Sequence, residues 1–460
     1  MIKFYQIGAL AIGCLILFAT PNLNAQEVTV FNLEQAISYA QDNHPDIKLK
    51  KLQIDDAREQ VRETAAIGIP QLNGGIEYQY FIQKPQQVAS DFLTPAVYAI
   101  LFAEQVVEPR AIEVSTQQFT FVQSHNLTPS LTLSSLIFDG SYIVGLKAAK
   151  EYGSLVQEDL KVSLAQVRKN VIDSYLPILI LDENLKNLDN NITNLQALLK
   201  ETKAIYEEGF AELLDVDRLQ LSLSNLISER DNLKRQRTVA LNALKIQMGL
   251  PIEQSINIDD NIEMVLANSR GAELIASTGD ISNRPEMDYL NTSIKLNELN
   301  IDRYRAAYLP SLSAFASYQN AYVADDFADG VWIPNTVVGA RLNVPLFAGM
   351  GRKAKVARAR IDLEKVKLQR DLAVDGFKLE LSNARTNYMN AEKRLQSRKE
   401  NLELAERIYE TTKIKYKEGV GSSIEVSNAE QSVYQSQQYY YQAIFELLRA
   451  ESDLAKALGM

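Results

Sequence analysis

The chain is nearly free of the side chains that carry out thiol, imidazole and metal chemistry. Its 460 residues include one cysteine, two histidines and one tryptophan. Cys14 lies in an N-terminal apolar segment, so we expect a mature protein without disulfides or reactive thiols. His44 and His125 stand alone, without ligand spacing, and no nucleophile elbow, zinc motif or acid pair of recognisable spacing is present. The sequence therefore predicts no enzyme activity, no cofactor and no metal site.

Excess positive charge and long apolar runs are also lacking. The formal net charge is -10, which argues against general nucleic-acid affinity, so we expect no nucleic-acid partner. Beyond the N-terminus, no stretch reaches the roughly 18 apolar residues that a membrane helix needs. If the chain enters a membrane, it must do so as strands.

The N-terminus has the pattern of a secretory signal. Lys3 precedes an apolar run over 7–20, and the small residue Ala25 follows Asn24. This pattern predicts a signal peptide over 1–25, since the run is too short to span a bilayer. The residues before Cys14 faintly resemble a lipoprotein cleavage box, and whether Cys14 is ever lipidated stays open.

What the chain does contain is an internal repeat. Phe138-Asp139-Gly140 opens a helical stretch that ends at Glu208-Gly209, and Phe347-Ala348-Gly349 opens another that ends at Glu418-Gly419. After each stretch the chain resumes as a second apolar helix. We therefore predict a duplicated unit of helix, strand pair and long helical hairpin. The predicted segments are a first repeat over 26–255, a linker over 256–283 and a second repeat over 284–460.

Apolar and small residues recur at 3-4 spacing along each long stretch, from Val171 to Tyr206 and from Leu381 to Tyr416. Such seams predict helices packed along their length. A helix over 141–208 would approach roughly 100 Å, with Pro177 bending or dividing it. The predicted return helices, over 214–248 and 424–458, are shorter. Their lengths suggest stacking end to end with helices over 46–67 and 286–308.

Four short segments alternate between polar and apolar residues. They predict strands at about 71–83, 127–138, 311–322 and 335–347. A half-buried sheet in a soluble domain would explain the alternation alone. Arg341 and Asn343 share one face opposite aliphatic residues, however, and Tyr80, Tyr318 and Tyr322 lie near strand ends, as in an aromatic girdle. Four strands cannot close a barrel, so a membrane form requires several copies.

Several motifs resemble the bacterial outer membrane efflux proteins, the TolC-like channel-tunnels, across nearly the whole mature chain. The motifs are Asn32-Leu33-Glu34-Gln35-Ala36-Ile37, Asn43-His44-Pro45, Ala66-Ile67-Gly68-Ile69-Pro70, Glu208-Gly209 before Leu214-Asp215-Val216, and Glu418-Gly419-Val420-Gly421 before Ile424-Glu425-Val426.

The resemblance implies a mainly α fold with a small β part. Three subunits would each give four strands to a twelve-stranded transmembrane β-barrel, and their helical hairpins would form a periplasmic α-barrel. It implies a passive exit duct in the outer membrane, in contact with its lipid, for efflux or secretion. The implied partners are a periplasmic adaptor protein and an inner-membrane transporter. The alternative is a secreted periplasmic coiled-coil scaffold without channel activity.

The resemblance also implies functional residues. By motif position, Glu425 and Asn428 fall at the pore constriction, although the family has a second acid where this chain has Asn428. Glu425 could instead simply stabilise a helix N-terminus. The hairpin tips, near 209–213 and 419–423, are where an adaptor would dock. The candidate contacts are Gly209, Phe210, Ala211, Gly419, Val420, Gly421, Ser422 and Ser423, and we expect the three glycines to supply positive-φ turns.

Two further segments carry expectations of their own. Gly349-Met350-Gly351-Arg352-Lys353 mimics a phosphate loop but lacks the full spacing, so we expect a strand-to-helix hinge. The segment over 84–126 is far longer than its counterpart in the second repeat. Its apolar run over 97–107 predicts a strand extension or a helix near the barrel mouth, and its role stays open.

Overall fold

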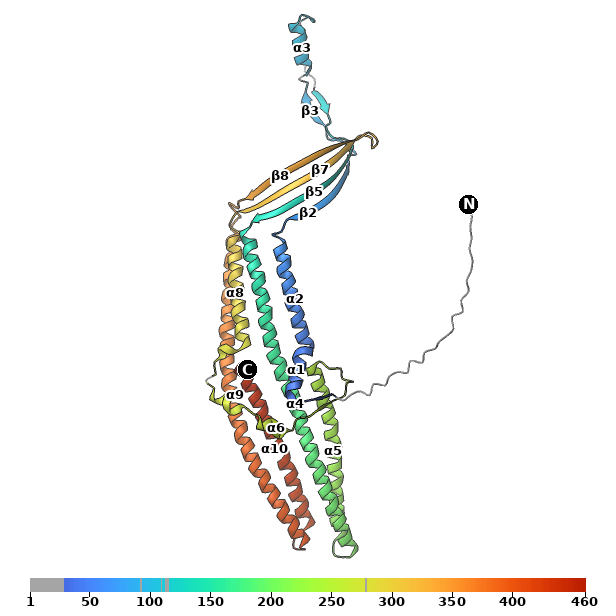
Figure 1. The fold of residues 1–460 in the computed structure, drawn as a ribbon, viewed down its shortest axis with the longest axis vertical. Coiled ribbons are helices and arrows are strands. Elements are labelled where there is room, and N and C mark those ends of the chain that lie inside the picture. The colour runs from blue at the N-terminus through green and yellow to red at the C-terminus, as the bar shows by residue number, and fades with distance from the viewer. Residues whose placement is uncertain (1–28, 92, 109, 112–115, 278) are drawn as a thin grey trace, which may run out of the picture. The chain divides into compact units, whose positions relative to one another are not determined.

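The computed structural model describes residues 29–460, except residues 92, 109, 112–115 and 278. The predicted signal peptide and Cys14 lie outside the described residues. Most of the described chain is helical, and one four-stranded sheet holds most of its strand residues (Figure 1).

The helices are α1 Leu33–Asn43, α2 Pro45–Ala66, α3 Leu93–Ala103, α4 Gly140–Glu207, α5 Leu213–Met248, α6 Ile262–Ala267, α7 Gly271–Ala276, α8 Pro285–Ala306, α9 Gly351–Lys417 and α10 Ser423–Ala457, with a 3-10 turn at Ile281–Asn283. Of these, α2, α4, α5, α8, α9 and α10 match predicted helices to within a few residues, whereas α1, α6 and α7 were not predicted. Helix α4 runs unbroken through Pro177, so proline does not divide it as one alternative expected. No helix in the described residues is long and apolar enough to cross a membrane.

The strands are β1 Thr29–Phe31, β2 Gln71–Tyr80, β3 Gln87–Ser90, β4 Thr116–Phe119, β5 His125–Phe138, β6 Ile256–Ile258, β7 Ser311–Ala324 and β8 Val331–Asn343. All four predicted strands are present, as β2, β5, β7 and β8. The short pairs β1–β6 and β3–β4 were not predicted. Three-residue strands carry too little alternation to stand out from the surrounding sequence.

The chain divides into two compact units. One comprises residues up to 48, 163–280 and 380–460, and the other comprises 49–162 and 281–379. Each unit therefore contains parts of both sequence repeats, and α2, α4 and α9 contribute to both. The predicted repeat boundaries remain statements about sequence rather than about compact units.

The second unit holds the antiparallel sheet, in the order β2-β5-β7-β8. Gln71 pairs with Ser134 and Ser311 pairs with Asn343, which places the strand ends nearest α2, α4, α8 and α9 at one end of the sheet. The connections over 81–124 and 325–330 lie at the opposite end. Both outer strands, β2 and β8, have an unpaired edge within the described residues.

The first unit is helical and buries the predicted seams. Val171, Ile178, Leu188 and Leu195 are at most 1% exposed, and Leu381, Ala384, Tyr388 and Ala391 of α9 are also buried. Helix α5 ends at Gly249, where a Cβ would lie 2.7 Å from the carbonyl oxygen of Asn43. The end of α5 therefore meets the chain just before α2, as the end-to-end arrangement requires.

Candidate functional site

The two hairpin tips share one backbone design. Gly209 and Gly419 both end a long helix in the left-handed region, with φ of 78° and 75°. The Gly209 and Phe210 N–H groups donate to the carbonyls of Tyr206 and Ile205, at 2.9 and 3.0 Å. Gly419 and Val420 repeat both bonds with Tyr416 and Lys415. This is the Schellman arrangement, which satisfies the last helix carbonyls and favours glycine at the left-handed position.

Gly421 differs from the prediction, because it is not among the positive-φ residues. A Cβ there would lie 3.0 Å from the Tyr416 nitrogen and 3.2 Å from the Lys415 carbonyl carbon. Close approach of backbone, rather than a left-handed turn, therefore favours a small residue at this position. The first tip has Ala211 at the matching position, so the tip geometry accepts a methyl group there.

Hydrogen bonds join the two hairpins near their tips. The buried Ser423 hydroxyl donates to the Asp215 carboxylate. Farther along, the hydroxyls of Thr202 and Tyr416 lie 3.2 Å apart, and those of Ser222 and Ser427 lie 3.3 Å apart. Each pair links a residue of the first hairpin to one of the second, and Thr202 is fully buried. The carboxylate of Asp215, in the first repeat, therefore binds a group of the same chain, whereas its counterpart Glu425 is exposed.

A shared apolar core lies behind these bonds. Val216 and Val426 occupy matching positions just after the two tips, and both are buried in one cluster with Leu195, Leu199 and Leu219. Because each valine side chain removes apolar area from water only when both hairpins are in place, the tips pack as one structure.

Glu425 and Asn428 are both exposed in the first turns of α10. They are three residues apart, so they share one face of the helix. Ser422 caps this helix by accepting a hydrogen bond from the Glu425 N–H at 3.4 Å. The helix-terminus interpretation of Glu425 therefore has direct support, since its carboxylate lies in the first turn, where negative charge is favourable. Its exposure also leaves the carboxylate accessible for a pore role.

The predicted adaptor contacts divide into two groups. Phe210 and Val420, at matching positions, are 85% and 77% exposed. Ser422 is also exposed. Ser423 is only 2% exposed, and its hydroxyl is bound by Asp215. The Ser423 side chain is therefore removed from the candidate contacts, because the chain itself covers it.

Sequence reasoning missed Glu430, which lies one turn beyond Val426 on α10. Its side chain is 8% exposed, although it can carry a charge. Burial raises the pKa of the Glu430 carboxyl to about 7, while the ammonium of Lys413 lowers it less strongly. Burial also raises the pKa of Tyr409 to about 12, and Glu430 adds to the rise. Glu430 shares a helix face with Val426 and Val433, which are also buried, and this spacing was the available signal.

The sheet places most polar and most apolar side chains on opposite faces, although Phe315, Ile333 and Val337 share the mainly polar face. The pairing places Leu72, Ile76, Leu131 and Val338 on one face, and all four are more than half exposed. The other face carries Asn73, Thr132, Ser317, Arg341 and Asn343. An exposed face this apolar marks a surface that contacts lipid or protein.

Aromatic residues collect on the apolar face at the sheet end farther from the four helices. The ring of His125 stacks on Tyr78 and also contacts the rings of Tyr80 and Phe327. Tyr322 continues the row to Phe327 and Trp332. Of the three tyrosines predicted to lie in such a girdle, Tyr80 and Tyr322 lie in this row, whereas Tyr318 pairs with Leu131 and Thr336 nearer the middle of the strands. The strand pairing also brings His125 and Trp332 into this aromatic row.

The insertion over 84–126 forms a β3–β4 pair and the helix α3. Helix α3 resolves the predicted choice between strand and helix for most of the apolar run, and none of its described side chains is buried. The base of the insertion is tied to the β7–β8 turn, because Asp325 accepts hydrogen bonds from Lys84 and from the Ser124 N–H. Nothing in the described residues covers the helix.

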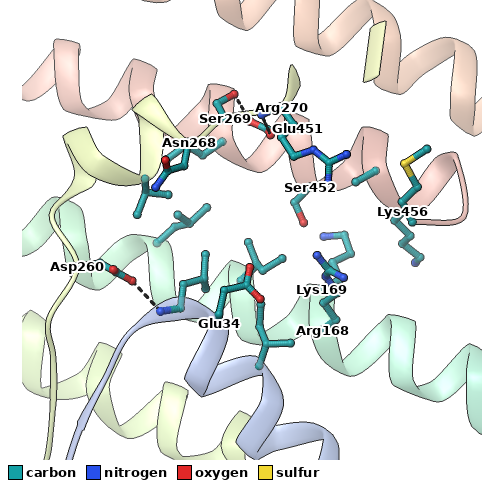
Figure 2. A pocket seen from close by; sticks show the side chains of 18 of the residues that line it. Glu34, Arg168, Lys169, Asp260, Asn268, Ser269, Arg270, Glu451, Ser452 and Lys456 are labelled. Atoms are coloured by element: carbon teal, nitrogen blue, oxygen red, sulfur yellow. Dashed lines mark hydrogen bonds between the residues drawn. The ribbon is translucent and has the colours of Figure 1, made fainter. Parts of the chain in front are cut away.

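A cavity of about 410 Å³ lies in the helical unit among α1, α4, the linker and α10 (Figure 2). Most of the charged side chains that line the cavity bind other groups of the chain. Asp260 accepts the Leu33 N–H at 2.7 Å, and Glu451 accepts the Arg270 N–H at 2.6 Å. Lys169 pairs with Asp173 and Asp453. These bonds hold the linker against the helices, so the cavity is a packing gap between elements of the fold.

The hinge prediction for residues 349–353 agrees with the backbone. Gly349 and Met350 both have positive φ, between the end of β8 and the start of α9. His44 lies at the boundary between α1 and α2, as expected. Within the described residues, no group of histidine, cysteine and acidic side chains is arranged to hold a metal ion.

Comparisons with known proteins agree on one family. The model of the family described as outer membrane efflux protein matches residues 36–250 and 281–460. A curated relative, the pyoverdine export outer membrane protein OpmQ of Pseudomonas aeruginosa, is 23% identical over 290 residues, which cover 63% of this chain and 60% of that protein. The chain thus spans about three fifths of that relative's length.

Solved structures show the same fold. A crystal structure of CusC aligns with a TM-score of 0.70 and 18% identity, covering 99% of both chains. The CmeC outer membrane channel of Campylobacter jejuni aligns with a TM-score of 0.68 and 16% identity, covering 99% of this chain and 94% of that one.

Proposed function

Because this chain belongs to the outer membrane efflux protein family, and so to the outer membrane, we propose that it is the exit duct of a tripartite efflux or secretion system. Three copies join their sheets edge to edge in the membrane, and their helical hairpins continue the duct into the periplasm. The duct conducts passively. Energy comes from an inner-membrane transporter, which a periplasmic adaptor protein connects to the hairpin tips.

The observation that carries this proposal is the four-stranded sheet with one apolar face, one polar face and two open edges. In a bilayer, unpaired backbone groups at an edge cost several kcal/mol each, so a lone sheet of this kind is excluded. Pairing β8 of one copy with β2 of the next satisfies both edges. The apolar face then meets lipid, and the face with Arg341 and Asn343 lines an aqueous lumen.

The tips supply the proposed gate and docking surface. Glu425 and Asn428 line the narrowest ring, where three carboxylates near one axis attract cations. Phe210, Val420 and Ser422, with the turn glycines and Ala211, meet the adaptor. Relatives are described as exporting pyoverdine or toluene, which favours small organic molecules as cargo. The proposal includes no catalytic step.

A planar bilayer tests the duct directly. The purified chain should insert from detergent and give discrete, long-lived conductance steps at low protein concentration. The competing scaffold should remain soluble without detergent and leave the bilayer current unchanged. Glu425→Ala separates the pore role of Glu425 from a helix-terminus role, because only a residue in the constriction changes the single-channel current.

A further inference from the structure

The first turns of α9 carry an unusual concentration of positive charge. Five cations, at Arg352, Lys353, Lys355, Arg358 and Arg360, occur before the first acid, Asp362. The matching helix of the first repeat, α4, has its first cation only at Lys147. The net charge of the whole chain is negative, so this cluster is a local feature of the second repeat.

Helix stability does not explain this cluster. The N-terminal end of a helix carries partial positive charge, so Arg352 and Lys353 in the first turn of α9 are unfavourable there. Helix α9 has no acid in its first turn to offset them. A sequence that breaks a local rule without local compensation commonly does so for a function.

Four of the five cations are exposed on two flanks of α9, because helical spacing puts Lys353 and Arg360 on one flank and Lys355 and Arg358 on the other. The inner side of α9 packs on α8, where Ala359 and Leu363 contact Ile301. Arg352 is held internally, since it donates to the Pro345 carbonyl at 3.4 Å and lies 5.9 Å from the Tyr308 ring centre. Lys353, Lys355, Arg358 and Arg360 are exposed, and none forms an ion pair with any residue that the structure describes.

Exposed apolar side chains lie next to these cations. Leu346, Phe347 and Met350, between β8 and α9, are 91%, 83% and 68% exposed. They follow directly after the exposed apolar side chain of Leu342 on β8. Along the chain, the exposed apolar face of β8 is therefore followed by an apolar loop and then by a cationic helix. This order matches the layers of a membrane surface, where acyl chains give way to charged headgroups.

We propose that residues 346–360, here called the basic collar, bind anionic phospholipid headgroups on the membrane surface that faces the helices. This inference rests on the proposed duct in the outer membrane. The cations from Lys353 to Arg360 span roughly 10 Å of helix rise, comparable with the depth of a headgroup layer. Each cation near an anionic surface strengthens the attachment, and salt weakens it. The collar would thereby fix the depth of the sheet in the bilayer.

The test uses tryptophan quenching by lipids with brominated acyl chains. The chain has one tryptophan, Trp332, at the other end of the sheet, so Phe347→Trp in a Trp332→Phe background reports on the collar alone. We expect brominated phosphatidylglycerol to bind at position 347 about fivefold more tightly than brominated phosphatidylcholine. The preference should approach one at about 0.5 M salt.

Two charge variants of this reporter protein complete the experiment. Changing Lys353, Lys355, Arg358 and Arg360 to Gln should remove the preference. The matched control changes Lys378, Lys393, Lys399 and Arg407 to Gln, lower on the same helix, and should keep it. In the unmodified chain, Trp332 should show no preference between the two lipids.

Three results would overturn the inference: equal quenching by both lipids, a preference that survives removal of the four collar cations, or no quenching at position 347. The last would mean that another copy of the chain covers the collar. Conductance recorded from the same vesicles distinguishes the two proposals. If channels conduct but show no lipid preference, only the basic collar is refuted. If the protein does not insert into the vesicles, or inserts and carries no current, the proposed duct is refuted as well.

Discussion

Replacing Glu430 with Gln should stabilise the chain in a pH-dependent way. Glu430 is 8% exposed between α9 and α10, and burial raises its carboxyl pKa from 4.5 to about 7. A carboxyl whose pKa rises on folding favours the folded chain only while it is protonated. This contribution is fully present below pH ~4.5 and is lost as the pH rises through about 7.

The size of the effect follows from the pKa difference. One pKa unit corresponds to about 1.4 kcal/mol, so ionising Glu430 in the folded chain costs about 3 kcal/mol at pH 8. Glutamine has nearly the same shape and never ionises. Glu430→Gln should therefore raise the free energy of unfolding by roughly 1–3 kcal/mol at pH 8, after allowing for the cost of burying its amide. At pH 4.5 the two proteins should differ little.

Thermal unfolding of the detergent-solubilised protein, followed by helical circular dichroism at pH 4.5, 6 and 8, measures this directly. Glu403→Gln is the matched control, because Glu403 is exposed on α9 and the charge change is the same. Its melting temperature should follow the unmodified chain at every pH. A Glu430→Gln protein that is less stable at pH 8 would show that Glu430 is ionised and favourably paired in the folded chain. Equal stabilisation at all pH values would show that the gain does not come from the ionisation of Glu430.

The remaining predictions concern the tips. Glu425→Ala should raise single-channel conductance and weaken divalent-cation block in planar bilayers, and unchanged current would remove Glu425 from the constriction. Ser423→Ala and Asp215→Ala should each lower stability by about 2 kcal/mol without adding in the double variant, because both break one charge-assisted hydrogen bond; additive losses in thermal unfolding would refute that bond. Gly419→Val should abolish efflux while trimers still assemble, because a β-branched residue is strained at φ 75°. Gly421→Ala should retain efflux, since Ala211 occupies the matching position, and equal loss in both variants would contradict this distinction.

Repetition and periodicity made the architecture predictable. The 3-4 seams along Val171–Tyr206 and Leu381–Tyr416 located the long helices, because a helix with neighbours must bury one stripe. Strict alternation around Ile76 and Val338 located two strands of the sheet. Both signals persist over enough residues to outweigh local exceptions such as Pro177, which α4 absorbs within its length.

Features that depend on partner segments were not predictable. The Asp215–Ser423 bond joins residues 208 positions apart, and no local pattern indicates that Ser423 is buried while Ser422 caps a helix. Gly421 resembled its neighbour Gly419 in sequence, but its cause is the closeness of the Lys415 backbone. The β1–β6 pair is similar, since three residues at Thr29–Phe31 pair with a segment far along the chain. The Asp215–Ser423 bond and the β1–β6 pair join residues far apart in the sequence, so no local pattern indicates them.

The central claim is that copies of this chain join β8 to β2 so that no strand edge faces lipid. Double-cysteine variants test this in the natural membrane. Each variant carries one cysteine on β2, at 73, 75 or 77, and one on β8, at 335, 337 or 339. The predicted mature chain has no other cysteine. We expect at least one pair to give oxidation-dependent covalent trimers, with no cross-link from either single variant. Monomers for every pair, in a protein recovered from the water-soluble fraction, would contradict the account.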